Sequence, residues 1–104
     1  MSPTKHLRAE AAAHLASGRL AEAGAAYRQL LAKLPRDFEA LHRLGMLKVQ
    51  AGANKDGHAL LQAALAVDPN QAEAWLHHAM ALQNLGQGEQ AAASYRRALA
   101  INPD

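Results

Sequence analysis

The amino-acid sequence predicts an all-α fold, an α-α superhelix (solenoid) of three antiparallel helix pairs. The first observation is a recurring proline, because Pro35, Pro69 and Pro103 are separated by 34 residues each time. The second is composition: Ala dominates the apolar residues, and aromatic residues make up only 4% of the chain. Small, unbranched side chains favour helices over strands. A period of this length is typical of helix pairs that stack on one another.

The repeat extends beyond the prolines to further positions that are identical in all three copies. These positions are Gly18, Gly52 and Gly86; Ala25, Ala59 and Ala93; Leu31, Leu65 and Leu99; and Ala32, Ala66 and Ala100. Other positions keep the size of the residue, since a small residue recurs at 23, 57 and 91 and a large one at 27, 61 and 95. We therefore expect a single domain over 1–104, with repeats at about 4–37, 38–71 and 72–104.

Glycine and proline divide each repeat into two helices. Glycine adopts the left-handed conformation that closes a helix, and proline cannot continue the second helix. The predicted helices span 4–17 and 20–33, then 38–51 and 54–67, then 72–85 and 88–101. Because one helix pair cannot bury both of its apolar faces, each pair must stack on its neighbour.

The residues within each copy resemble the tetratricopeptide repeat. Its first helix carries a Trp, a Leu-Gly pair and a Tyr, and its second carries Ala, an aromatic residue, Ala and a closing Pro. The third copy matches best, with Trp75, Leu82 in place of the Tyr, Gly86, Ala91, Tyr95, Ala98 and Pro103. The second has Leu41 in place of the Trp, then Leu44, Gly45, Gly57, Leu61, Ala64 and Pro69. The first copy is the most degenerate, which suits a capping role. The resemblance covers about residues 4–104.

No pattern in the sequence indicates catalysis. The chain has no cysteine, and it lacks a glycine-rich phosphate loop, a metalloprotease helix motif and a nucleophile elbow. We therefore expect no enzymatic activity and no cofactor. The net charge of +2 does not indicate nucleic-acid binding. No stretch approaches the ~20 apolar residues of a membrane-spanning helix, so we expect no membrane insertion and a cytoplasmic location.

Six histidines raise the question of a metal site. His77 and His78 are adjacent on a predicted helix and face about 100° apart, so they are not a ligand pair. His42 and His77 lie on successive first helices and could approach across a groove, but a third ligand is not evident. We therefore predict groove-lining or solvated histidines and no metal.

The resemblance implies a binding surface, because the first helices of tetratricopeptide repeats line a concave groove that holds an extended peptide or a partner's helix. In the first copy, Lys5, Arg8, Ala9 and Ala12 occupy the outward positions of that helix. Met46 and Met80 lie one repeat apart, and Met suits adaptable recognition surfaces. The predicted binding residues are Arg8, His42, Arg43, Met46, Gln50, His77, Met80, Gln83 and Asn84.

Two specialised binding modes of the family are not matched. The chaperone-adaptor branch grips a carboxylate with Lys, Asn and Arg, but the corresponding positions here are Arg8, Ala12, Arg43, Glu73 and His77, and only the first keeps its character. Glu73 would repel a carboxylate. The branch attached to protein O-linked sugar transferases carries an Asn ladder, whereas the positions here are Ala9, Arg43 and His77.

Several other residues receive structural interpretations. Trp75 is predicted to pack between the helices of its own pair. Asp37, Asn70 and Gln71 precede helices and are expected to satisfy free amides there, while solubility is sufficient to explain Arg28, Arg96 and Arg97 on second helices.

The principal prediction is a protein-interaction scaffold with no chemistry of its own, whose partner is a protein or peptide. One alternative is the N-terminal recognition arm of a larger bacterial enzyme, such as a glycosyltransferase, sulfotransferase or methyltransferase. A second is a self-assembling scaffold, because the last helix would expose a stripe that contains Tyr95 and Leu99, and two copies could meet at this open C-terminal end. Three interpretations account for that stripe: the natural chain continues past Asp104 into further repeats or an attached enzyme domain, two copies meet there, or the stripe stays exposed at a cost in stability. We favour the first.

Overall fold

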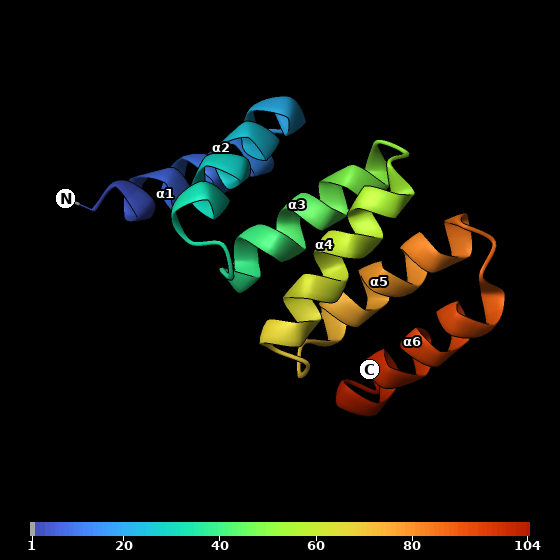
Figure 1. The fold of residues 1–104 in the computed structure, drawn as a ribbon. Coiled ribbons are helices and arrows are strands. Elements are labelled where there is room, and N and C mark those ends of the chain that lie inside the picture. The colour runs from blue at the N-terminus through green and yellow to red at the C-terminus, as the bar shows by residue number, and fades with distance from the viewer. Residues whose placement is uncertain (1) are drawn as a thin grey trace.

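The computed structural model describes residues 2–104, which form six α-helices without a strand. The helices are α1 (Pro3–Ala16), α2 (Leu20–Lys33), α3 (Phe38–Gln50), α4 (Asn54–Val67), α5 (Ala72–Asn84) and α6 (Gly88–Ile101). They form three hairpins stacked in chain order, with the two termini at opposite ends of the stack (Figure 1). The molecule measures 44 × 25 × 24 Å. The predicted fold class is confirmed, and the predicted helix boundaries agree to within one residue.

The two helices within each pair are joined by a turn that requires glycine. Gly18, Gly52 and Gly86 have φ angles of 74°, 86° and 80°, a region that other residues rarely enter because Cβ approaches the carbonyl oxygen. The amide of the following residue then bonds back to the helix, as Arg19 N does to the carbonyl of His14 at 2.9 Å. The turn thus satisfies carbonyls that the helix end leaves free.

The two connections between pairs contain Pro35 and Pro69, and only the first has the predicted side-chain cap. Asp37 accepts a hydrogen bond from the backbone N–H of Ala40 at 2.9 Å and so caps α3. The prediction for Asn70 and Gln71 is wrong, because Gln71 precedes α5 without a side-chain cap. Instead, Asp68 accepts from the Asn70 amide at 3.0 Å and from the Gln71 side chain at 2.8 Å, and this stabilises the turn rather than the helix.

The two helices of the middle pair touch at their backbones. A Cβ added to Gly57 would lie 2.6 Å from Val49 Cγ2 and 3.0 Å from the carbonyl oxygen of Gly45. A Cβ on Gly45 would in turn lie 2.8 Å from Leu61 Cγ. Glycine at both positions therefore allows α3 and α4 to cross closely and lets Leu61 bury completely.

All three repeats contribute small and large side chains to the buried core. Its largest fully buried side chains are Tyr27, Leu30, Leu61 and Leu82, one or two from each repeat. Ala11, Ala23, Ala40, Ala64, Ala74, Ala79 and Ala81 are also fully buried between them. Close helix packing leaves room for little more than alanine at these positions, whereas many other alanines, such as Ala12 and Ala92, are exposed.

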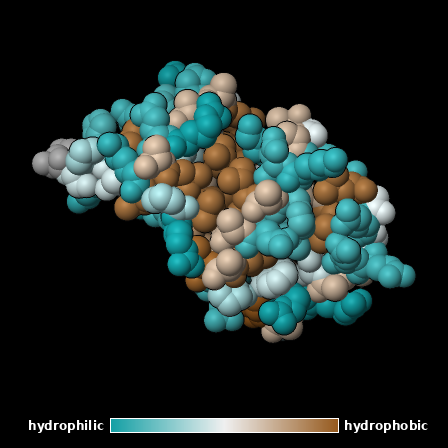
Figure 2. Space-filling view, in the orientation of Figure 1, coloured by the Kyte–Doolittle hydropathy of each residue, from teal (hydrophilic) through white to brown (hydrophobic). Residues whose placement is uncertain are grey.

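The contact between the first and second pairs leaves an apolar hollow. Figure 2 shows hydrophobic side chains gathered in the middle of the face turned toward the viewer, between the α1–α2 pair and α3. The hollow has a volume of about 390 Å³ and is walled by Leu20, Gly24, Leu44 and Leu47, with Arg28 and Lys48 at its edge.

None of the helices in the described part of the chain is both long enough and apolar enough to cross a bilayer.

Candidate functional site: the face of the first helices

The candidate site is the row of side chains that α1, α3 and α5 present on one side of the stack. Each first helix carries the same register, so equivalent positions recur every 34 residues, and α3 packs directly against α5. The predicted binding residues lie on these three helices. The sequence does not predict that several of these binding residues form hydrogen bonds and ion pairs with side chains of neighbouring helices, as the structure shows.

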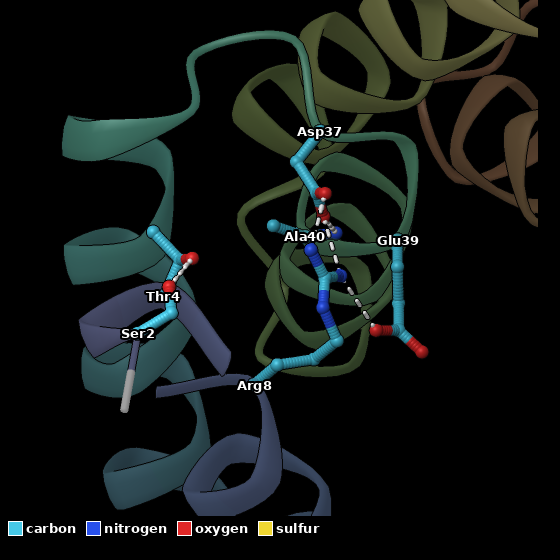
Figure 3. A network of polar contacts seen from close by, with 6 residues as sticks. All are labelled: Ser2, Thr4, Arg8, Asp37, Glu39 and Ala40. Carbon is cyan, nitrogen blue, oxygen red and sulfur yellow. Dashed lines mark hydrogen bonds and ion pairs between the residues drawn. The ribbon is translucent and has the colours of Figure 1, made fainter. Parts of the chain in front are cut away.

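Arg8 joins α1 to α3 through two carboxylates. Its guanidinium donates to both oxygens of Asp37, at 2.7 and 3.0 Å, and to Glu39 Oε1 at 3.0 Å (Figure 3). The two-point contact with Asp37 is a strong, charge-assisted arrangement. It holds the pKa of Asp37 below its usual value, assisted by the bond from the Ala40 amide and opposed by burial. Arg8 is thus a fixed bridge rather than a free cation.

Arg43 makes a simpler bridge, to one carboxylate, between α3 and α5. Its guanidinium donates to Glu73 Oε1 at 3.0 Å, and the Glu73 side chain remains 57% exposed. Burial by itself would raise the pKa of Glu73, but the hydrogen bond and the charge of Arg43 outweigh it, so the pKa lies below its usual value. Both arginines of the row are therefore already paired with carboxylates of the next first helix.

A pair of histidines lies beside the second bridge. His42 Nε2 and His77 Nδ1 are 2.8 Å apart and share a hydrogen bond, and the ring of Phe38 packs against His42 at a centroid distance of 5.6 Å. Burial lowers the pKa of His42 to about 4, assisted by the neighbouring His77 and Arg43. Burial also lowers the pKa of His77. Both rings are neutral at pH 7, so one nitrogen donates and the other accepts.

Two predicted binding residues are less accessible than expected. His42 is only 5% exposed, because the rings of Phe38 and His77 lie against it, so it is more enclosed than the outward position predicted for it. Met46 is half-buried and packs against the core cluster of the first two repeats. Met80, one repeat later, is 40% exposed. The difference arises because Met46 has a further repeat on each side.

The remaining predicted residues lie at the far ends of α3 and α5 and carry amides. Gln50, Gln83 and Asn84 are exposed. Asn84 Nδ2 donates to Asn54 Oδ1 at 3.1 Å, and Gln83 Oε1 accepts from the Tyr95 hydroxyl at 2.8 Å. Each amide keeps further donors or acceptors for a ligand.

Glu39, Glu73 and Leu76 lie on this face but were not among the predicted binding residues. Glu39 and Glu73 occupy equivalent positions one repeat apart, and Leu76 occupies the position equivalent to His42. The register could have found all three, since it assigns them to the same face as Lys5 and Arg8. Leu76 is 42% exposed and lies one helical turn from Met80, so these two side chains form an apolar pair on α5.

The predicted packing of Trp75 against the second helix of its pair is seen in part, as a contact with Arg97. Trp75 Nε1 donates to the carbonyl of Pro69 at 2.8 Å, and the guanidinium of Arg97 on α6 lies 4.9 Å from the ring centroid. The ring is half-buried. Arg97 therefore has a packing role that the sequence-based interpretation, which assigned it to solubility, did not anticipate.

Two family models described as tetratricopeptide repeat match the chain, one over residues 14–75 and the other over 72–104. The chain belongs to the tetratricopeptide repeat family. Cellulose synthase operon protein C of Komagataeibacter xylinus is 39% identical over 61 residues, which are 59% of this chain and 5% of that protein. This tetratricopeptide repeat chain thus spans a small part of that relative.

Two solved structures illustrate how closely known proteins superpose on this chain. A mutant O-GlcNAc transferase from Thermobaculum terrenum has a TM-score of 0.92 and 32% identity, over 97% of this chain and 19% of that one. The first tetratricopeptide repeat domain of Spaghetti (RPAP3), bound to an HSP90 peptide, has a TM-score of 0.90 and 17% identity, over 97% and 80% of the two chains. The second similarity is one of fold alone.

Proposed function

We propose that this chain is a protein-interaction module that holds an extended segment of another protein along α1, α3 and α5. The supporting observation is the continuous row of side-chain contacts on these helices. Arg8 ties α1 to α3, and the Arg43–Glu73 and His42–His77 contacts tie α3 to α5. A surface already fixed by such contacts loses little conformational freedom on binding, and this favours affinity.

The chemistry of the row favours an apolar segment over an acidic one. Arg8 and Arg43 are both paired with carboxylates, so an incoming carboxylate would have to displace a partner and face Glu73. Leu76 and Met80 instead present exposed apolar surface, and Met adapts to varied side chains. The amides of Gln50, Gln83 and Asn84 can bond to the backbone of an extended peptide.

A phage-displayed library of random peptides tests this proposal. Selection on the wild-type chain should enrich peptides rich in apolar residues, and Met80→Glu should abolish their capture because it places a charge in the apolar pair. Gln62→Glu adds the same charge at an exposed position of the second helix α4 and should leave capture unchanged. Enriched peptides that bind Met80→Glu as well as wild type would contradict the proposal.

A second candidate function is the recognition arm of a larger enzyme, which would bind the substrate protein while another domain supplies catalysis. It is supported by two relatives that are each at least 32% identical to this chain. The chain covers only 5% and 19% of their lengths, and one of them is a transferase. An immunoblot of the source cells with an antibody against these residues measures the size of the natural protein. A band at the mass of these 104 residues alone, 11.1 kDa, would contradict the proposal of an enzyme arm.

The exposed end of the stack supports a self-assembling scaffold as a further possibility. Leu99 is 58% exposed and lines a hollow of about 600 Å³ with Leu76, Tyr95 and Ala98. Contact between two copies at this end would cover that surface. Sedimentation velocity should then show a dimer that Leu99→Glu dissociates, whereas a monomer at high concentration would contradict assembly.

A further inference from the structure

Three potential metal ligands converge where α3 packs against α5. His42, Glu73 and His77 each offer one donor atom, and these atoms all lie within 4.8 Å of one another. The two imidazole nitrogens are only 2.8 Å apart. The sequence indicates the two histidines but not the carboxylate that completes the set.

The helices fix this convergence. Glu73 and His77 are four residues apart on α5, so they lie on the same face one turn apart. His42 comes from α3 and is held by burial and by the ring of Phe38. One ligand is therefore rigid, and the other two project from a single neighbouring helix.

We propose that His42, Glu73 and His77 form a binding site for a divalent transition-metal ion, and that Zn²⁺ is the ion this donor set suits best. Two imidazoles and one carboxylate are a known ligand set for Zn²⁺ sites with an open fourth position. Imidazole ligands favour Zn²⁺ and its neighbours in the first transition series over Mg²⁺ or Ca²⁺, which prefer oxygen donors.

The required movement is small. Zn–N bonds of about 2.0–2.1 Å at a tetrahedral angle place two ligand nitrogens about 3.3 Å apart. The present separation of 2.8 Å must therefore widen by about half an ångström. His77 is half-buried and can make this adjustment by rotation of its side chain, so α3 and α5 need not separate.

Arg43 is the main opposing charge, and its position is compatible with the ion. It binds Glu73 through Oε1, so Oε2 remains available to the metal. A ligand carboxylate that also accepts a hydrogen bond from outside the site is oriented by it. The same bridge that ties α3 to α5 would thus hold Glu73 toward the two histidines.

The fourth coordination position would be left to water or to a donor atom of a partner. Binding of Zn²⁺ does not depend on the proposed peptide function, because all three ligands belong to this chain. Metal binding and peptide capture can therefore fail independently.

Isothermal titration calorimetry with zinc chloride on the chain without any affinity tag tests the proposal. We expect a single ion per chain, and Glu73→Gln and His77→Gln should each weaken binding by about tenfold or more. The matched control is His6→Gln. His6 and Glu10 are also four residues apart on a helix, at 3.3 Å, but they are exposed on α1 and have no part in the three-residue cluster, so this variant should bind Zn²⁺ as wild type does.

Two-dimensional NMR of the imidazole groups locates the ion. Stoichiometric Zn²⁺ should shift the ring resonances of His42 and His77 and leave those of His6 unchanged, and circular dichroism checks that each variant is folded. The proposal is overturned if the wild-type chain does not bind Zn²⁺. It is also overturned if Glu73→Gln and His77→Gln bind as well as wild type, or if the shifted resonances belong to other histidines.

Discussion

The close backbone contact between α3 and α4 gives a sharp prediction, because two effects of Gly57→Ala have opposite signs. Alanine is favoured over glycine inside a helix by about 1 kcal/mol. The added Cβ, however, would lie 2.6 Å from Val49 Cγ2, 3.0 Å from the Gly45 carbonyl oxygen and 3.1 Å from the Val49 amide nitrogen. Two of these three atoms belong to the backbone and cannot rotate away.

Overpacking of a core typically destabilises by about 1–3 kcal/mol, and contact with backbone favours the upper end of that range. After the gain in helix propensity, we expect a net loss of about 2 kcal/mol in the free energy of unfolding, or roughly 10 °C in Tm for a chain of this size. Thermal unfolding followed by circular dichroism measures this change.

Gly24→Ala is the matched control. Gly24 also lies inside a helix, but the nearest atom to its added Cβ is the flexible end of Arg28, at 3.6 Å. This variant should gain stability, by up to about 1 kcal/mol. A Tm for Gly57→Ala that is equal to wild type, or raised as in Gly24→Ala, would refute the close crossing of α3 and α4.

Three further predictions concern other parts of the stack. Burial, assisted by His58, lowers the pKa of His78 from 6.5 to about 4. Below pH 6.5 the unfolded chain therefore takes up a proton that the folded chain excludes. The free energy of unfolding should fall by up to about 3 kcal/mol as the pH drops from 6.5 to about 4. Urea unfolding at several pH values measures this loss, and the free energy of unfolding should fall less steeply with decreasing pH in His78→Asn than in wild type. Trp75→Ala should lower stability by about 2 kcal/mol, below the range for a fully buried ring because Trp75 is half-buried; an unchanged Tm would mean that the ring does not pack. Asp37→Ala removes a cap and an ion pair and should lower stability by about 1–2 kcal/mol, whereas Glu39→Ala, which removes only an exposed pair, should change it by less than about 1 kcal/mol.

The architecture could be predicted from the sequence because it depends on local rules applied repeatedly. Glycines that close helices and prolines that end them recur every 34 residues, so the helix boundaries follow with little reference to tertiary contacts. The alternation of small and large residues likewise predicts which faces pack. The cap at Asp37 follows from residue type, but the same reasoning is wrong for Gln71, where Asp68 binds the side chain instead.

The pairing and burial of the side chains in the candidate site were harder to predict, because they depend on contacts between repeats. Residue register assigns Arg8, Arg43 and His77 to one face, but it does not show that each already has a partner on the neighbouring helix. The burial of His42 under Phe38 is a tertiary effect of the same kind. Glu73 shares a helical face with His77, and its role as a third ligand becomes evident only when α3 is placed against α5.

The proposed function requires the row of side chains on α1, α3 and α5 to receive a partner segment. The most direct test is a two-dimensional ¹H–¹⁵N NMR titration of the labelled chain with a peptide selected from the displayed library. If the segment lies along this row, the largest amide shift changes should occur in α3 and α5, around Met80 and Arg43, with small changes in α4. Changes concentrated in α4 and α6, or around Leu99 at the exposed end, would contradict it.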